Sequence, residues 1–384
     1  MTEYNFCTYF DSGYLTRGLA LYRSLERRCP NFTLWILCLD SACHSALTRA
    51  KIPRARIISL PELQTRDTEF DQAKQNRSRI EYYFTATPVL LSYVLNEVSP
   101  GDLVTYLDAD LFFFRSPALL LESLAEASCG LIEHRFPENL EILRSRGIYN
   151  VGWVSLRNDK VGVACAEWWR RCCLEWCHDR VEDGRFADQK YLDVVPQNFS
   201  RVQILDYPGA NLAPWNLGRH CVSASNGELL ADNQPVIFFH FHGLRQISRK
   251  LYSANFGKFL HKPNDVVIRQ IYCPYIRALV QEEKQIAQSI REWRRISPGH
   301  GRGALSVLEI AAPSFVREIL KGRHVIFFQA APLRRRSKAV VLRKPERGVL
   351  ELDHQKAETI AETAAAATRP DERPGSRLRS TARS

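Results

Sequence analysis

The first 240 residues alternate short apolar runs with longer amphipathic stretches, and this pattern constrains the fold more than any other feature of the sequence. The short runs are rich in β-branched and aromatic residues, as strands are, whereas the longer stretches suit helices. The alternation predicts an α/β fold with a mostly parallel sheet flanked by helices. We expect strands at 5–10, 33–39, 56–59, 103–107, 129–133, 151–156, 202–205 and 236–241, and helices at 15–29, 41–50, 79–96, 116–127, 161–179 and 185–195.

Beyond this pattern the chain changes character twice. Residues 265–295 carry apolar residues at helical spacing, which predicts a small helical region after the main domain. The last 54 residues, 331–384, hold over half of the net charge of +11 and have few aromatic residues, so we expect them to be mostly disordered. We therefore expect a main domain at 1–260, a mainly helical extension at 261–330 and a basic disordered tail at 331–384.

Composition excludes several classes of protein. Apolar residues make up 45% of the 384 residues, and no run approaches the roughly 20 apolar residues that cross a bilayer. The first residues lack a signal-peptide pattern, and the eleven cysteines are scattered, so we expect a cytoplasmic, reducing location. The pI of 9.2 raises the alternative of a nucleic-acid or anionic-surface binder, but most of the excess charge lies in the tail, so no nucleic acid is expected.

Two glycine motifs that commonly bind phosphates are missing. No G-x-G-x-x-G follows the first predicted strand, and no G-x-x-x-x-G-K-[ST] occurs anywhere. If a nucleotide binds, other groups must neutralise its phosphates.

A carboxylate pair follows one buried strand. The apolar run 103–107 leads into Asp108-Ala109-Asp110, and side chains two residues apart on an extended chain point to the same face. Both carboxylates could then share a divalent cation, which would offset the cost of bringing like charges together. The plainer alternative is one helix-capping aspartate and one turn aspartate.

A second predicted strand, 236–241, runs into His240-Phe241-His242-Gly243. Either histidine could supply an imidazole to the same cation, and the other would then be an ordinary core histidine. Imidazole with carboxylates suits Mn²⁺ better than Mg²⁺, which prefers oxygen ligands, although Mg²⁺ stays an alternative.

With these residues the chain resembles the nucleotide-sugar glycosyltransferases of the glycogenin and lipopolysaccharide-galactosyltransferase type, which have the Rossmann-like GT-A fold, a mixed sheet flanked by helices. Five short motifs occur in the family's order within residues 4–250. They are Asp11-Ser12-Gly13-Tyr14, Tyr106-Leu107-Asp108-Ala109-Asp110, Tyr149-Asn150-Val151-Gly152, Asp188-Gln189-Lys190 and His240-Phe241-His242-Gly243.

The resemblance implies a role for each matching residue. The metal ligands would be Asp108, Asp110 and His240, with His240 preferred to His242 because it occupies the family's histidine position. The donor nucleotide would contact Tyr9, Asp11, Tyr14, Arg79, Ala109, Gly152 and Gly243. The catalytic residues near the donor sugar would be Asn150, Asp188 and Gln189.

One position departs from the family pattern. Gln246 stands where the family often has a lysine that contacts the diphosphate, and the candidate substitutes are Arg245, Arg249 and Lys250, with Arg77 or Arg79 as further candidates. Trp215 could stack on a sugar, although a buried Trp in the core is as common.

The function implied is Mn²⁺-dependent transfer of a sugar from a nucleotide-diphosphate sugar, with UDP expected, to a saccharide or lipid-linked acceptor. Family likeness implies retention of anomeric configuration, whereas an inverting route would need a general base, for which Asp188 is the candidate. The rival enzyme is a metal-dependent phosphatase of the haloacid-dehalogenase type, which carries its D-x-D on the first strand, whereas here the motif lies beyond residue 100.

Residues 313–344 suggest contact with a membrane surface, because apolar residues stand beside Arg334-Arg335-Arg336 and further basic residues. A basic cluster and an apolar face can together hold a protein at the cytoplasmic surface of a membrane. The alternative is that 325–328 pack as a strand or helix on the main domain.

Overall fold

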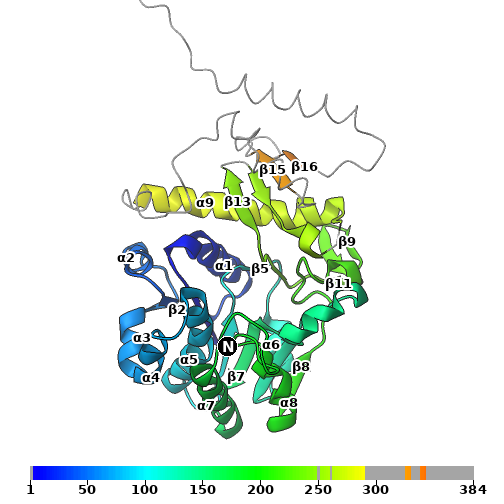
Figure 1. Cartoon of the computed structure of the whole chain (residues 1–384). Coiled ribbons are helices and arrows are strands. Elements are labelled where there is room, and N and C mark those ends of the chain that lie inside the picture. Colours follow the sequence, from blue (N-terminus) through cyan, green and yellow to red (C-terminus); the bar gives the residue numbers. More distant parts are fainter. Residues whose placement is uncertain (1–2, 249–250, 260–261, 290–324, 330–337, 343–384) are drawn as a thin grey trace, which may run out of the picture.

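A computed structural model describes residues 3–248, 251–259, 262–289, 325–329 and 338–342 (Figure 1). Its main sheet has seven strands in the order β3-β2-β1-β4-β7-β6-β8. These strands are β1 (Tyr4–Phe10), β2 (Phe32–Cys38), β3 (Ala55–Ser59), β4 (Leu103–Leu107), β6 (Cys129–Glu133), β7 (Tyr149–Arg157) and β8 (Val202–Leu205). β7 runs antiparallel to both of its neighbours, and the other pairs are parallel. The predicted α/β fold with a mixed sheet flanked by helices is confirmed.

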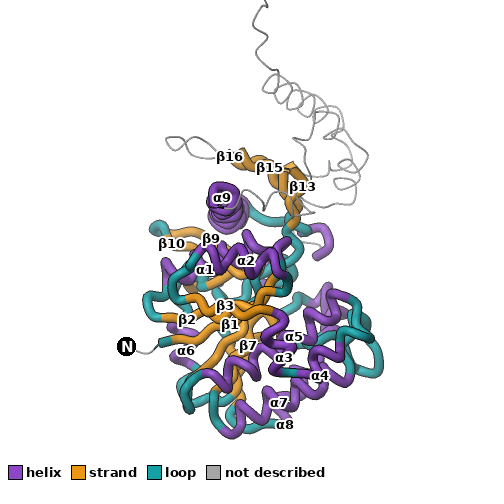
Figure 2. Tube along the Cα trace, turned by 90° about the vertical axis from the view of Figure 1, so that its left-hand side faces the viewer, coloured by secondary structure: helices purple, strands orange, loops and turns teal. Residues whose placement is uncertain are grey.

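Helices cover both faces of this sheet (Figure 2). One apolar core joins the sheet to α1 (Leu15–Arg28), α2 (Ser41–Ala50) and α6 (Ala118–Ser123). The other core joins it to α3 (Leu60–Arg66), α4 (Thr68–Ala73), α5 (Arg79–Glu97) and α7 (Lys160–Glu175), with the short α8 (Val195–Asn198) nearby. Because β1 and β4 are parallel neighbours, the residues after both strands leave the sheet at the same edge.

Smaller sheets stand beside the main one. β5 (Leu111–Phe113) pairs antiparallel with β12 (Phe238–His240), and β9 (Val222–Ser225), β10 (Glu228–Ala231) and β11 (Gln234–Pro235) form a three-stranded sheet. A four-stranded sheet contains β13 (Arg245–Ser248), β14 (Leu251–Ser253), β15 (Val325–Gln329) and β16 (Lys338–Leu342). The strands β5, β9, β10 and β13, which are three or four residues long, are not predicted from the sequence.

The helical prediction for 265–295 is confirmed over its described part. A π-helical turn, Val267–Tyr272, leads into α9 (Cys273–Ser289), which lies alongside α1 (Figure 1). Residues 290–295, and the tail 331–384 apart from β16, lie outside the described residues. No helix in the described part of the chain is long and apolar enough to cross a membrane.

Residues 325–329 form a strand that pairs with β14, which agrees with the packed alternative for this segment rather than with a membrane-facing helix. The rest of the 313–344 stretch, apart from β16, lies outside the described residues.

Three predicted helices are wrong in extent or type. The stretch 185–195 is a loop that ends in a 3-10 turn, Lys190–Val194, because Ala187 takes a left-handed backbone conformation (φ 47°) that interrupts any helix. The helix predicted at 116–127 shrinks to α6, since the Leu124 N–H turns back to the Leu121 and Glu122 carbonyls. The helix predicted at 161–179 ends at Glu175, where Trp176 becomes extended.

Candidate active site

The two aspartates of the D-x-D motif sit in a tight turn rather than on an extended strand, so the predicted strand geometry is wrong. β4 ends at Leu107, and the Leu111 N–H then donates to the Asp108 carbonyl at 3.1 Å. The Asp108 N–H donates to the Gly152 carbonyl on β7 at 3.2 Å, which fixes the start of the turn. The turn still presents both carboxylates to one side, because β5 begins immediately after Asp110 and pairs with β12.

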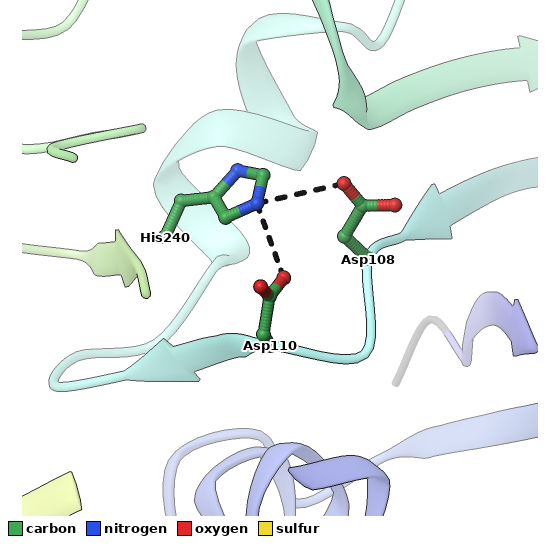
Figure 3. A group of neighbouring side chains, drawn as sticks. All are labelled: Asp108, Asp110 and His240. Carbon is green, nitrogen blue, oxygen red and sulfur yellow. Dashed lines mark ion pairs between the residues drawn. The ribbon is translucent and has the colours of Figure 1, made fainter. Parts of the chain in front are cut away.

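That pairing brings His240 to the carboxylates (Figure 3). His240 lies opposite Leu111 in the β5–β12 ladder, and its Nε2 lies 3.1 Å from Asp110 Oδ1 and 3.6 Å from Asp108 Oδ2. One ligand atom from each of the three residues lies within 4.8 Å of the other two. Within the described part of the chain this is the one such group, and His242 is not in it.

Burial and the charges of neighbouring side chains shift the pKa of each member of this cluster. Burial raises the pKa of Asp108, and Asp110 adds to the rise while His240 opposes it. Burial would also raise the pKa of Asp110, but His240, His242 and Arg17 bring it down to about 2. Burial lowers the pKa of His240, yet the two carboxylates more than offset this and leave it above its ordinary value. Two close carboxylates and an imidazole fit Mn²⁺ by ligand chemistry, and a bound cation would remove the repulsion between the carboxylates.

The residues expected around the nucleoside lie beside this turn. Asp11 follows β1, accepts a hydrogen bond from the Tyr14 N–H at 3.1 Å and forms an ion pair with Arg79. Arg79 begins α5 and also donates to the Tyr83 hydroxyl at 2.8 Å, and its side chain is 71% exposed. The Tyr14 side chain is exposed as well. An ion pair therefore holds two predicted nucleotide contacts together, the exposed Arg79 and the mostly buried Asp11.

Tyr9 lies beneath the carboxylates. Its ring packs against Tyr106 at 5.6 Å between centroids, and its hydroxyl is 3.2 Å from the Thr87 hydroxyl. The Tyr106 hydroxyl in turn donates to Asp108 Oδ1 at 2.9 Å. Tyr9 is therefore linked to the cluster of Asp108, Asp110 and His240 through Tyr106, which supports Asp108 although the sequence assigns it no role.

Asp188 is a buried carboxylate next to this group. It is 4% exposed, and burial raises its pKa to about 7, with the charge of Asp108 adding to the rise and a hydrogen bond from Thr87 opposing it. Among the described residues, its Oδ2 finds no hydrogen-bond partner. The neighbouring Gln189 donates to the Arg146 carbonyl at 3.0 Å. Asp188 is thus a proton-bearing or acceptor group with one unused oxygen.

Asn150 and Gly152, on β7, contact His240 from the far side of the ring. Asn150 Oδ1 is 3.2 Å from His240 Nδ1, and Asn150 Nδ2 is 3.1 Å from His134 Nε2. A Cβ at Gly152 would fall 2.6 Å from Asn150 Oδ1 and 2.9 Å from the His240 ring. His134, just after β6, is a site residue that the sequence analysis missed, since a single histidine there has no distinguishing pattern.

Gly243 and Arg17 lie near Gln246, the residue that stands in the family's lysine position. Gly243 needs its left-handed conformation (φ 74°) to turn the chain after His242. Arg17 donates to the Leu244 carbonyl at 2.8 Å, and its guanidinium lies 4.4 Å from the Tyr14 ring centre. A cavity of about 210 Å³ lies here, lined among others by Arg17, Gln246 and Arg245, which is one of the predicted phosphate contacts.

The other predicted phosphate and sugar contacts differ in position. Arg77 is buried and donates to the Cys173 and Leu174 carbonyls at 3.3 and 3.1 Å, so it is a structural residue and cannot reach a ligand. Arg249 and Lys250 lie outside the described residues. Trp215 is 4% exposed and packs edge-on to His240 at 5.0 Å between ring centroids, which makes it a buried support of His240 rather than an open stacking platform.

Known proteins show two kinds of similarity. No family model matches the chain. Solved structures similar to it include the galactosyltransferase LgtC in complex with donor and acceptor sugar analogues (17% identity, 62% of this chain and 87% of that chain, TM-score 0.44). Others are mouse xyloside xylosyltransferase 1 (12%, 63% and 98%, 0.41) and the Streptococcus pneumoniae glycosyltransferase GlyE (15%, 74% and 64%, 0.43).

Two Bacillus subtilis proteins are much closer in sequence. YfnD, an uncharacterized protein, is 29% identical over 279 residues, which cover 72% of this chain and 88% of YfnD. YfnF, also uncharacterized, is 33% identical over 285 residues, which cover 72% of this chain and 90% of YfnF. The chain therefore belongs to the same protein family as YfnF of Bacillus subtilis.

Proposed function

We propose that this protein is a glycosyltransferase that transfers a sugar from a nucleotide-diphosphate sugar, with UDP as the expected nucleotide, to a saccharide or lipid-linked saccharide. The observation that carries the proposal is the cluster of Asp108, Asp110 and His240 at the carboxyl edge of β4. α/β sheets bind their ligands at this edge. The sequence has neither of the two glycine-rich phosphate-binding motifs, so a cation held here would neutralise the charge of the diphosphate instead. Mn²⁺ is the expected ion, with Mg²⁺ as the alternative.

Cleavage of a sugar–diphosphate bond builds negative charge on the leaving phosphate and positive charge on the anomeric carbon. A bound divalent cation would act as a Lewis acid for the leaving diphosphate. The nucleoside would contact Asp11, Tyr14 and Arg79. The ion pair with Asp11 holds the Arg79 guanidinium in place. Tyr9 and the Ala109 backbone complete that side beneath the carboxylates.

Arg17 supplies the cation that Gln246 lacks. Its guanidinium is fixed by the Leu244 carbonyl and the Tyr14 ring, lines the same cavity as Gln246 and already lowers the pKa of Asp110. A guanidinium can bind two phosphate oxygens at once, which suits a diphosphate better than a neutral amide does.

Asp188 and Gln189 are assigned to the donor sugar. The unused oxygen of Asp188 can accept a hydrogen bond from a sugar hydroxyl, which would satisfy a buried group that is costly to leave unpaired. We expect retention of anomeric configuration, in which case Asp188 orients the sugar. The pKa of about 7 would also suit a general base in an inverting reaction, and the anomeric proton signal of the first product in an NMR spectrum separates the two outcomes.

Turnover of a panel of UDP-, GDP-, ADP- and CMP-sugars, with Mn²⁺ or with EDTA, tests the proposal. We expect release of the nucleotide with at least one donor, dependent on the metal and lost in Asp108→Asn and Asp110→Asn. Asp265→Asn is the matched control, because that side chain is 74% exposed. Full activity in either D-x-D variant, or metal-dependent hydrolysis of simple phosphate monoesters without turnover of any nucleotide-sugar, would contradict it.

A further inference from the structure

A line of three buried polar side chains runs from the backbone next to β7 to the metal-facing ring of His240. His134 Nδ1 is 3.1 Å from the Ile148 carbonyl, His134 Nε2 is 3.1 Å from Asn150 Nδ2, and Asn150 Oδ1 is 3.2 Å from His240 Nδ1. All three side chains belong to residues that are no more than 5% exposed. Water cannot readily replace any of these contacts, so their direction matters.

The direction of every hydrogen bond in this line follows from its first member. A carbonyl oxygen only accepts, so His134 Nδ1 must carry a proton that it donates to Ile148. Burial lowers the pKa of His134 to about 3, so the ring is neutral and its Nε2 has no proton. That nitrogen must accept from the Asn150 amide NH₂, which turns the amide oxygen towards His240.

The consequence for His240 is a fixed proton position. Asn150 Oδ1 accepts a hydrogen bond, so His240 Nδ1 must donate one. The opposite nitrogen, Nε2, is the atom that faces Asp110 at 3.1 Å and Asp108 at 3.6 Å. Once a cation takes the place of the Nε2 proton, the Nε2 lone pair would point at that cation, and the imidazole ring would not have to rotate.

Packing holds the line in this arrangement. The His134 ring stacks on Phe136 at 4.7 Å and 10°, and Trp215 packs edge-on between the His134 and His240 rings. The Trp215 indole N–H also donates to the His134 carbonyl at 2.9 Å. Gly152 leaves the room that the Asn150–His240 bond needs, since any Cβ there would overlap it.

We propose that His134 and Asn150 are positioning residues that hold His240 in the tautomer with its proton on Nδ1, so that Nε2 is the ligand atom for the divalent cation. The inference rests on the proposed function only for the use to which that cation is put. In this arrangement Asn150 positions His240 rather than contacting the donor sugar. If the Asn150 amide were flipped by 180°, its NH₂ would face His240, and His240 Nδ1 would have to accept that hydrogen bond. The ring proton would then sit on Nε2, so an N–H instead of a lone pair would point at the cation.

The direct test is the protonation of His240 in the full chain labelled with ¹⁵N-histidine and loaded with Zn²⁺ alone. Zn²⁺ is diamagnetic, and N/O sites bind it more tightly than Mn²⁺, so two-bond proton–nitrogen spectra can assign each ring nitrogen. We expect His240 to carry its proton on Nδ1 and to bind the metal through Nε2. A proton on Nε2, or metal bound through Nδ1, would overturn the inference without the need for any variant.

Variants of His134 give an independent readout, the affinity for Mn²⁺ alone measured by calorimetry. His134→Phe keeps the ring packing but cannot accept from Asn150, and we expect about 10- to 100-fold weaker binding, the usual effect of losing such a support. His134→Gln can donate to Ile148 and accept from Asn150, and we expect it to restore most of the affinity. His220→Phe, in which the lost ring pairs with Asp232, is the matched control and should bind like the parent.

Unchanged Mn²⁺ affinity in a folded His134→Phe protein, or a Gln variant as weak as the Phe variant, would overturn the inference. Neither readout uses a nucleotide-sugar. If the line behaves as described but no nucleotide-sugar is turned over, the proposed function fails and this inference stands. If nucleotide-sugars are turned over while His240 carries its proton on Nε2, the proposed function stands and this inference fails.

Discussion

Replacing Asp188 by asparagine should stabilise the metal-free protein at neutral and alkaline pH while abolishing sugar transfer. The carboxyl is 4% exposed, and its Oδ2 finds no hydrogen-bond partner among the described residues. Burial, with the charge of Asp108, raises its pKa from 3.8 to about 7. Asparagine has nearly the same shape but never ionises, so the variant removes the cost of the buried charge.

The shifted pKa of Asp188 fixes how its contribution to the free energy of unfolding changes with pH. Between pH 3.8 and about 7 the folded parent keeps a proton that the unfolded chain has lost, so the stability contributed by Asp188 falls as pH rises through this window. Each pH unit costs about 1.4 kcal/mol, and the full shift sets an upper bound of about 4 kcal/mol above neutral pH. The variant escapes this loss.

Urea unfolding of both proteins in EDTA over a pH series measures the difference. We expect the free energy of unfolding of Asp188→Asn relative to the parent to be flat below pH 4, to rise up to pH 7 and then to level off. Asp183→Asn, whose side chain is 80% exposed, should show no such trend. A difference that is constant with pH, or that falls as pH rises, would show that burial does not hold a proton on Asp188.

Three further predictions concern the metal and the diphosphate. Gly152→Ala should weaken Mn²⁺ binding at least about 10-fold in calorimetry, because its Cβ would lie 2.6 Å from Asn150 Oδ1; parent-like affinity would show that the site can relax. Mn²⁺ alone should raise the melting temperature of the parent because it offsets the carboxylate repulsion, and Asp110→Asn should lose this shift in a thermal melt; an equal shift in both proteins would place the ion elsewhere. Arg17→Gln should weaken UDP binding in the presence of Mn²⁺ while the affinity for Mn²⁺ itself changes little, with the 72%-exposed Arg269→Gln as control; unchanged UDP affinity would remove Arg17 from the diphosphate site.

The strands of the main sheet could be predicted from the sequence because each leaves a local pattern, whereas the family resemblance named the three residues that the structure brings together. The buried run 103–107 is β4 with the same bounds, and the D-x-D that follows it meets His240, the histidine that the family pattern prefers. The reason given for the shared face of Asp108 and Asp110 is nevertheless wrong. A turn brings them together, and only the β5–β12 pairing, which joins residues more than 120 positions apart, completes the cluster.

The supports of the site could not be predicted because their roles arise from tertiary contacts. His134 is a lone histidine after a strand, and it matters only because Ile148 and Asn150 lie on its two sides. Arg17 looks like a solvated helix residue until the turn at Gly243 brings the Leu244 carbonyl to it. Helical periodicity also predicted a helix at 185–195, but the backbone takes a left-handed conformation at Ala187, next to Asp188, and no α-helix spans this stretch.

Calorimetric titration of the full chain with UDP, in Mn²⁺ and in EDTA, measures whether the protein needs a divalent cation to bind a nucleotide. UDP should bind in the presence of Mn²⁺, bind much more weakly in EDTA, and not bind measurably to Asp110→Asn in either condition. Equal binding of UDP with and without Mn²⁺, undiminished binding to Asp110→Asn, or no binding of UDP, GDP or ADP in the presence of Mn²⁺ would contradict a metal-dependent nucleotide-sugar site at Asp108, Asp110 and His240.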